Sequence, residues 1–145
     1  RNRRIGFIFQ GFNLISGLTA IENVELPLIY RKMERKERKK LVYQSLERVG
    51  LKKRMRHRPS EMSGGQQQRV AIARAIAASP PIIFADEPTG NLDSKSGEEV
   101  INILRELNQE GRTVILITHD NGIARQCNRV IHIHDGRIDL DERLS

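Results

Sequence analysis

The sequence predicts an α/β fold in which helices cover a parallel sheet and an all-helical segment is inserted between two of the strands. Three short apolar runs lack polar alternation, which is typical of strands buried on both faces: Ile5–Phe9, Ile82–Ala85 and Val114–Ile117. Helical patterns separate these runs, as they do in parallel sheets. The stretch from Thr19 to Glu61 shows no strand pattern, so we expect only helices there.

The N-terminal half is expected to hold one strand followed by two helices. Thr19 and Glu22 have the spacing of a capping box, so a helix should begin at Thr19. Pro27 should kink or end that helix, because proline lacks the backbone N–H that a helix interior needs. A second helix should span about residues 34–49, with Gly50 in the position that follows a last helical turn.

The C-terminal half is expected to alternate helices and strands. Ser63 should cap a helix that runs to about Ser79, where two prolines follow. Asp135 and Gly136 predict a tight hairpin turn. The other predicted elements, in chain order, are the strand Ile82–Ala85, a turn over 88–93, a helix over 94–109, the strand Val114–Ile117, a short helix near Ile123, and hairpin strands at 130–133 and 138–140.

Length and composition fit one globular domain. The chain has 145 residues, of which 38% are hydrophobic and 30% charged. No apolar run approaches the roughly 20 residues that a membrane-spanning helix needs. A single cysteine, Cys127, excludes an internal disulfide and favours a reducing compartment.

The positive charge is concentrated in one segment. The net charge is +7, yet residues 31–58 alone hold thirteen Lys or Arg against three Glu. A surface this basic suits nucleic acid, anionic lipid head groups or an acidic partner. The alternative is a solvated helix face on which Lys and Arg stems cover apolar residues.

Two adjacent carboxylates follow the second apolar run. Asp86 and Glu87 stand at its C-terminal end, where α/β sheets bind their ligands. Successive strand residues point in opposite directions, so the two acids need not share a role. Asp86 is a candidate to hold Mg²⁺, and Glu87 to polarise an attacking water. Taken alone, the pair is better explained as two surface acids in a loop.

A serine and two glycines open the helix predicted after the insertion. In Ser63-Gly64-Gly65-Gln66, the glycines allow backbone N–H groups to approach a phosphate, and the serine adds a hydroxyl. The same string also describes a capped helix after a flexible turn. Its place about twenty residues before an apolar strand ending in Asp-Glu makes the phosphate interpretation much more specific.

Three further side chains follow strands or lie close to the carboxylates. His119 comes just after the third apolar run, where it could hydrogen-bond a γ-phosphate or the attacking water. Gln10 comes directly after the first run, where its amide could ligate Mg²⁺. Asp93 lies in the loop after the carboxylates and could touch a second subunit.

Read in order, Gln10, Ser63–Gln66, Asp86-Glu87, Leu92-Asp93 and His119 resemble the Q-loop, signature, Walker B, D-loop and H-loop of ATP-binding cassette (ABC) ATPases. Longer strings at residues 9–14, 19–28 and 85–94 are similar to the macrolide exporters and lipoprotein-releasing systems. The resemblance covers essentially the whole chain. It implies the C-terminal part of a P-loop NTPase (RecA-like) sheet, divided into a core strand and Q-loop (1–12), a helical subdomain (13–62), and a signature helix with the remaining core (63–145).

The resemblance also implies an activity and its partners. A head-to-tail homodimer would hold ATP and Mg²⁺ between subunits. One subunit would supply Gln10, Asp86, Glu87 and His119, and the other Ser63, Gly64, Gly65 and Gln66, with Asp93 at the contact between subunits. The protein would power an export-type membrane permease, docked on the helical subdomain, from the cytoplasmic face of the membrane. Nucleic acid would not be its partner.

The 145 residues contain no phosphate-binding G-x-x-x-x-G-K-S/T sequence, because Phe12 and Asn13 follow Gly11 where that pattern needs Lys and Ser or Thr. We therefore expect a fragment of a longer ATPase that is inactive alone. Two other readings stay open: an ABC-type ATPase associated with nucleic acid, and a non-catalytic fragment that dimerises or docks on a permease.

Overall fold

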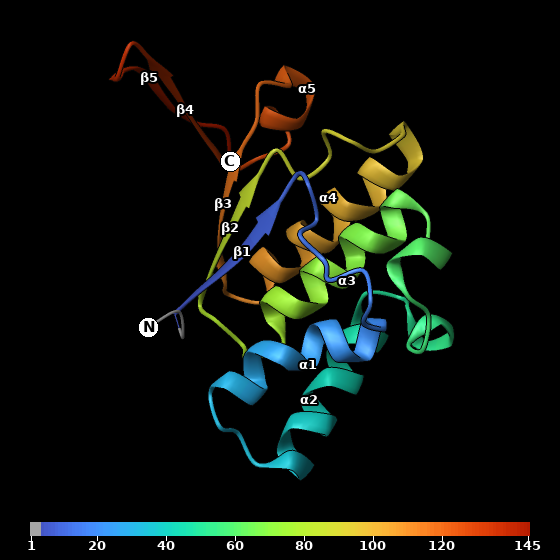
Figure 1. The fold of residues 1–145 in the computed structure, drawn as a ribbon. Helices are drawn as coiled ribbons and strands as arrows, with labels where there is room; N and C mark the ends of the chain where they lie inside the picture. Colours follow the sequence, from blue (N-terminus) through green and yellow to red (C-terminus); the bar gives the residue numbers. More distant parts are fainter. Residues whose placement is uncertain (1–3) are drawn as a thin grey trace.

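The computed structural model describes residues 4–145, which form a three-stranded parallel sheet, a separate two-stranded hairpin and five α-helices (Figure 1). The sheet contains β1 (Ile5–Phe9), β2 (Ile82–Asp86) and β3 (Thr113–Ile117) in the order β1-β2-β3. All three predicted core strands are therefore present and adjacent. Their carboxyl ends meet at one edge, since Phe9 pairs with Asp86 and Asp86 with Ile117.

Helices cover one face of this sheet (Figure 1). Ile8, Ile83 and Ala85 point toward that face and are completely buried, in contact with the core that includes α3 and α4. The expectation of helices on both faces is wrong for the part of the chain that is described. On the opposite face Phe7 is 38% exposed and Ile115 44% exposed.

The inserted segment is helical, as predicted. Helix α1 (Ala20–Tyr30) begins with the expected capping box, in which Thr19 Oγ1 accepts from the Glu22 amide and the Glu22 carboxylate accepts from the Thr19 amide. The helix does not end at Pro27 but continues to Tyr30. Proline removes only its own N–H from the ladder, and the last turn is held by Leu28, which is buried in the core.

Helix α2 (Arg35–Arg48) lies beside α1 and α3 and is followed by Gly50 with φ +79°, as the sequence predicts. Two short 3₁₀ turns, Lys52–Arg54 and Pro59–Glu61, lead back to the core. Leu46 is fully buried between these elements, so the insertion shares one continuous apolar core with the sheet.

Helix α3 (Gly64–Ile76) starts at the predicted cap, Ser63, but ends three residues earlier than expected. Ser79 takes the left-handed conformation, with φ +53°, because the chain must turn sharply before Pro80 and Pro81. The helix packs on β1, α1, α2 and α4 and is the central element of the molecule.

The remaining elements match their predicted positions. They are α4 (Ser94–Gln109), α5 (Asn121–Ala124), β4 (Arg129–His134) and β5 (Arg137–Arg143). Strands β4 and β5 pair antiparallel around Asp135-Gly136, both of which have positive φ, and the hairpin projects away from the rest of the molecule (Figure 1). Among residues 4–145, every helix is too short or too polar to cross a bilayer.

Candidate active site

The carboxyl edge of the sheet gathers four of the sequence-predicted site residues. Gln10 directly follows β1, Asp86 ends β2, Glu87 follows it, and His119 lies two residues beyond β3. Their proximity follows from the parallel pairing, because strands that run the same way end at the same edge. The sequence predicted this convergence.

Glu87 is fixed by contacts on both its backbone and its side chain. Its amide donates to the Ile117 carbonyl at 2.9 Å, extending the pairing of β2 with β3 by one residue. Its φ of +46° is left-handed, which is uncommon for a residue with a side chain and turns the chain sharply out of the strand. The carboxylate then accepts from the His119 amide at 3.0 Å.

The carboxylate of Glu87 also contacts the ring of His119. Glu87 Oε1 lies 2.5 Å from His119 Nδ1, and the Glu87 side chain is mostly shielded while the His119 ring is 90% exposed. The contact orients the imidazole so that its other nitrogen, Nε2, is at the end of the ring away from Glu87. Glu87, predicted to polarise an attacking water, and His119, predicted to contact a γ-phosphate or that water, therefore touch one another, which the sequence alone did not reveal.

Gln10 is held against the loop that follows the carboxylates. Its Nε2 donates to Asn91 Oδ1 at 3.2 Å, and Asn91 Nδ2 donates to the Gln10 carbonyl at 3.2 Å. Gly90 makes this approach possible, because a Cβ there would lie 2.5 Å from Gln10 Nε2. With its nitrogen engaged, the amide presents its oxygen as the free end.

Asp86 lies at the C-terminal end of β2, and no cluster of three or more His, Cys, Asp or Glu within residues 4–145 suits a metal. Asp86 pairs with Phe9 in register, so it points to the uncovered face of the sheet. A carboxylate and an amide oxygen are ligands that Mg²⁺ accepts when phosphate and water oxygens complete its shell. Asp86 and Gln10 therefore fit a nucleotide-bound Mg²⁺ by their chemistry.

The Ser63–Gln66 turn forms a complete capping box. The Gln66 amide donates to Ser63 Oγ at 3.2 Å, and the Ser63 amide donates to Gln66 Oε1 at 3.0 Å. Ser63 is exposed, and the turn bonds to itself rather than to Gln10, Glu87 or His119. Gly65 packs tightly on α4, since a Cβ at Gly65 would lie 2.7 Å from Ser96 Oγ.

Asp93 begins α4 and is exposed. Hydrogen bonding with the side chain of Ser96 lowers the pKa of the Asp93 carboxyl, against an opposing effect of burial. Gly65 also approaches Ser96, which brings the start of α3 against the start of α4.

Two further residues of α3 contact the site, and sequence reasoning missed both. Gln68 is fully buried and donates to the carbonyls of Phe9 and Pro88. Arg74 donates to the carbonyls of Phe12 and Asn13, two residues with positive φ. A buried polar residue on the inner face of a helix is the signal that could have found them, but it emerges only once the helix face is known.

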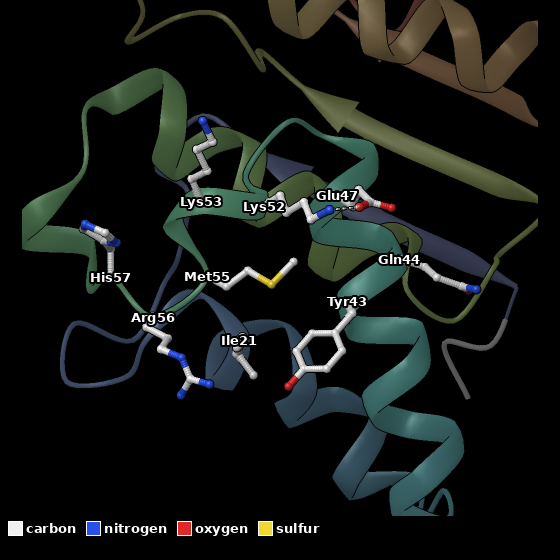
Figure 2. A pocket seen from close by; sticks show the side chains of 9 residues that line it. All are labelled: Ile21, Tyr43, Gln44, Glu47, Lys52, Lys53, Met55, Arg56 and His57. Carbon is white, nitrogen blue, oxygen red and sulfur yellow. Dashed lines mark ion pairs between the residues drawn. The ribbon is translucent and has the colours of Figure 1, made fainter.

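A second feature lies on the helical insertion. An open hollow of about 660 Å³ is lined by Ile21 of α1, Tyr43, Gln44 and Glu47 of α2, and Lys52, Lys53, Met55, Arg56 and His57 of the following connector. Figure 2 shows the side chains of Ile21, Tyr43 and Met55 near one another, and an ion pair between Lys52 and Glu47. None of the residues at the carboxyl edge of the sheet lines it.

Comparisons with known proteins identify the family of this chain. The profile of the family described as "ABC transporter" matches residues 1–90. The chain is 53% identical over 143 residues to YvrO of Bacillus subtilis, an uncharacterized ABC transporter ATP-binding protein, covering 99% of this chain and 62% of YvrO. The chain belongs to the ABC transporter family.

Two other relatives are similarly close. The chain is 51% identical over 97% of its length to MacB 2 of Yersinia pestis, a macrolide export ATP-binding/permease protein, of which it covers 21%. The dimeric ATP-binding cassette MJ0796, solved in a post-hydrolysis state with ADP and Pi, superposes with a TM-score of 0.83 at 50% identity, covering 98% of this chain and 63% of that one. MJ0796 comes from Methanocaldococcus jannaschii.

These comparisons confirm the predicted family and fold: an ABC ATPase cassette of the P-loop NTPase class. The relatives are ABC transporter ATP-binding proteins, so the family relationship supports ATP binding. The chain spans about three fifths of the length of the separate ATP-binding relatives that it matches, 62% in the case of YvrO. The division into residues 1–12, 13–62 and 63–145, and the role of each site residue, remain predictions.

Proposed function

We propose that the gene product containing this chain binds and hydrolyses ATP and thereby powers an export-type ABC transporter. The observation that carries the proposal is the carboxyl edge of the sheet, where Gln10, Asp86, Glu87 and His119 converge and Glu87 is fixed by His119. Similarity to MacB 2, which is named as an export protein, supports the export type.

Glu87 is the proposed general base. Its carboxylate is the one at this edge whose position is fixed by both a backbone amide and an imidazole, at 3.0 and 2.5 Å. A base held in place orients an attacking water without having to reorganise. His119 contacts Glu87 through Nδ1, and its exposed ring is proposed to contact a phosphate oxygen.

Asp86 and Gln10 are proposed to hold Mg²⁺, which, when bound, neutralises charge that develops on the transferred phosphoryl group. Ser63, Gly64, Gly65 and Gln66 are proposed to contact the ATP held by a second copy of the chain, with Asp93 near the contact. The exposed position of Ser63, whose turn bonds to itself rather than to Gln10, Glu87 or His119, and the dimeric form of MJ0796 support that arrangement.

The test of this proposal is Mg²⁺-dependent ATP turnover by the complete gene product. Glu87→Gln should lower kcat by about 10²- to 10³-fold and leave ATP binding intact, because it removes the base and preserves the shape of the side chain. The control is Glu98→Gln, an exposed glutamate on α4. Equal turnover by wild type and Glu87→Gln would remove Glu87 from the role of base.

The membrane subunit is proposed to dock on the helical insertion, which would place the protein on the cytoplasmic face of the membrane. The hollow in Figure 2 supports this, because its lining combines the apolar side chains of Ile21 and Met55 with the cationic side chains of Lys53 and Arg56. The complete gene product should be recovered with membranes, and charge reversal of Lys53 and Arg56 should release it without loss of turnover. Micromolar DNA binding that weakens steeply with salt would instead favour a nucleic-acid ATPase.

A further inference from the structure

One buried side chain links the two loops that carry the proposed site. Gln68, in the second turn of α3, has no exposed surface, and its Nε2 donates to the Phe9 carbonyl at 3.1 Å and to the Pro88 carbonyl at 2.6 Å. Phe9 immediately precedes Gln10, and Pro88 immediately follows Glu87. A single amide therefore spans the point at which β1 and β2 end.

We propose that Gln68 is a positioning residue that fixes Gln10 and Glu87 relative to each other; this inference rests on the proposed ATPase function. Both loops leave the sheet at this point, and Glu87 does so in a left-handed conformation. The primary amide of Gln68 offers two N–H donors on one nitrogen, so each carbonyl can receive one of them. Removing the donors leaves the two loops joined only by the exposed hydrogen bonds between Gln10 and Asn91.

The orientation of the Gln68 amide follows from its surroundings. Two carbonyl oxygens face Nε2, and the reversed amide would place Oε1 against both of them. In the observed orientation Oε1 is buried and has no hydrogen-bond partner among the described residues. An unpaired buried acceptor offsets much of what the two donated bonds contribute to stability. Placement of the two loops is therefore the main effect of this side chain.

Arg74, two turns further along α3, acts on one of the two loops only. Its guanidinium donates to the carbonyls of Asn13 at 2.7 Å and Phe12 at 2.9 Å, which lie beyond Gln10. Neither nitrogen reaches the loop that follows β2. Gln68 is thus distinguished among the α3 side chains by its contact with both loops.

The experiment compares Gln68→Met with wild type in the complete gene product. Methionine matches the length of glutamine but donates no hydrogen bond. We expect kcat for ATP hydrolysis to fall about ten- to hundredfold, because displacement of catalytic groups slows the chemical step. KM should change less than about threefold. Gln68→Asn, which is too short to reach both carbonyls, should give a smaller loss of the same kind and serves if the methionine variant folds poorly.

Two controls separate positioning from general stability. Gln67→Met removes a side-chain donor from the same helix, but that donor contacts only the Met62 carbonyl at 3.3 Å, so kcat should not change. Ile72→Val removes a methyl group from the fully buried face of α3 and should lower Tm without lowering kcat. If Gln68→Met lowers Tm but leaves kcat as Ile72→Val does, the inference is overturned.

Hydrogen–deuterium exchange provides a readout that is independent of turnover. In Gln68→Met the amides of residues 11–13 and 90–92 should exchange faster together, while those of α2 should not change. Unchanged exchange in either segment would overturn the inference. If wild type and Glu87→Gln both fail to hydrolyse ATP, the proposed function fails and the exchange result alone decides the role of Gln68.

Discussion

Gly64 and Gly65 are neighbours in sequence, yet an added methyl group would meet different surroundings at each. A Cβ at Gly65 would lie 2.7 Å from Ser96 Oγ and 2.8 Å from Ser96 Cβ, whereas at Gly64 the nearest atom is Leu92 Cδ2 at 3.5 Å. We expect Gly65→Ala to lower the free energy of unfolding by about 1–3 kcal/mol through overpacking. Gly64→Ala should be neutral or slightly stabilising, because alanine favours the helix. Urea denaturation measures both.

The Ser96→Gly background is the matched control for Gly65→Ala. Ser96→Gly removes the two side-chain atoms that the new methyl group would meet. In that background Gly65→Ala should therefore lower the free energy of unfolding much less than it does in wild type. An equal cost in both backgrounds would show that the glycine is needed for another reason than its contact with α4.

At the residue scale, the sequence predicted positions better than contacts. The order of Gln10, Asp86, Glu87 and His119 after apolar runs predicted that they would meet at one edge, because parallel strands leave little choice. The contact of Glu87 with His119 depends on a left-handed backbone angle, and the role of Gln68 depends on which helix face is buried. Neither of these is encoded in a local pattern.

The packing of β1 against α3 requires a residue without a side chain. Gly6 is buried, and a Cβ there would lie 2.6 Å from the backbone carbonyl oxygen of Ala75, which cannot move aside as a side chain can. Gly6→Ala should therefore lower the free energy of unfolding by about 1–3 kcal/mol or more, measured by denaturation with urea. Gly17→Ala, with no atom within 4 Å of the new methyl group, should change it by less than about 0.5 kcal/mol. Equal effects would contradict the close approach of β1 to α3.

Among the elements, those with strong end signals were predicted well. The caps at Thr19 and Ser63 set the starts of α1 and α3, and the glycine after α2 sets the end of that helix; the structure confirms all three. Pro27 was misleading, since burial of Leu28 in the core outweighs the missing bond of a proline. The apolar runs predicted the strands correctly, but the prediction that both faces would be covered is wrong for the described residues, because coverage depends on elements elsewhere in the fold.

At the scale of the whole molecule, Arg48 connects the helical insertion to the core. It forms ion pairs from α2 to Glu110 at the end of α4, with Nη1 donating to Glu110 Oε1 at 3.1 Å. Hydrogen bonding with Arg48 lowers the pKa of Glu110. A lowered folded-state pKa stabilises the fold above the ordinary glutamate pKa, and this contribution is lost as pH falls through the lowered value.

Arg48→Met should therefore raise the pKa of Glu110 toward its ordinary value and remove the acid-range loss of stability that the pair causes. Carbon-13 NMR titration of the carboxyl groups measures this shift. Arg112→Met is the control, because Arg112 acts on Glu110 only through a weaker charge interaction, and it should leave most of the shift in place. Since the pair is exposed, the effect on stability should be small.

The arrangement of the elements leaves one face of the sheet uncovered among the described residues. Ile5, Phe7, Phe9, Ile115 and Ile117 lie on it, each between 37% and 44% exposed. The ring of Phe7 stacks on that of Phe9 with centroids 6.0 Å apart and tilts against Phe84 at 5.9 Å, so the patch is contiguous. A contiguous apolar patch on a folded domain attracts other apolar surfaces.

The polypeptide of residues 1–145, produced by itself, should therefore bind the dye ANS and self-associate in a concentration-dependent way. Phe7→Thr with Ile115→Thr should weaken both effects without unfolding the chain, because threonine keeps a high strand propensity and neither side chain lies in the buried core. Ile133→Thr, on the projecting hairpin and 70% exposed, is the control and should alter neither. If all three proteins bind ANS equally, the dye reports some other surface, and if wild type stays monomeric at high concentration, the patch does not drive association.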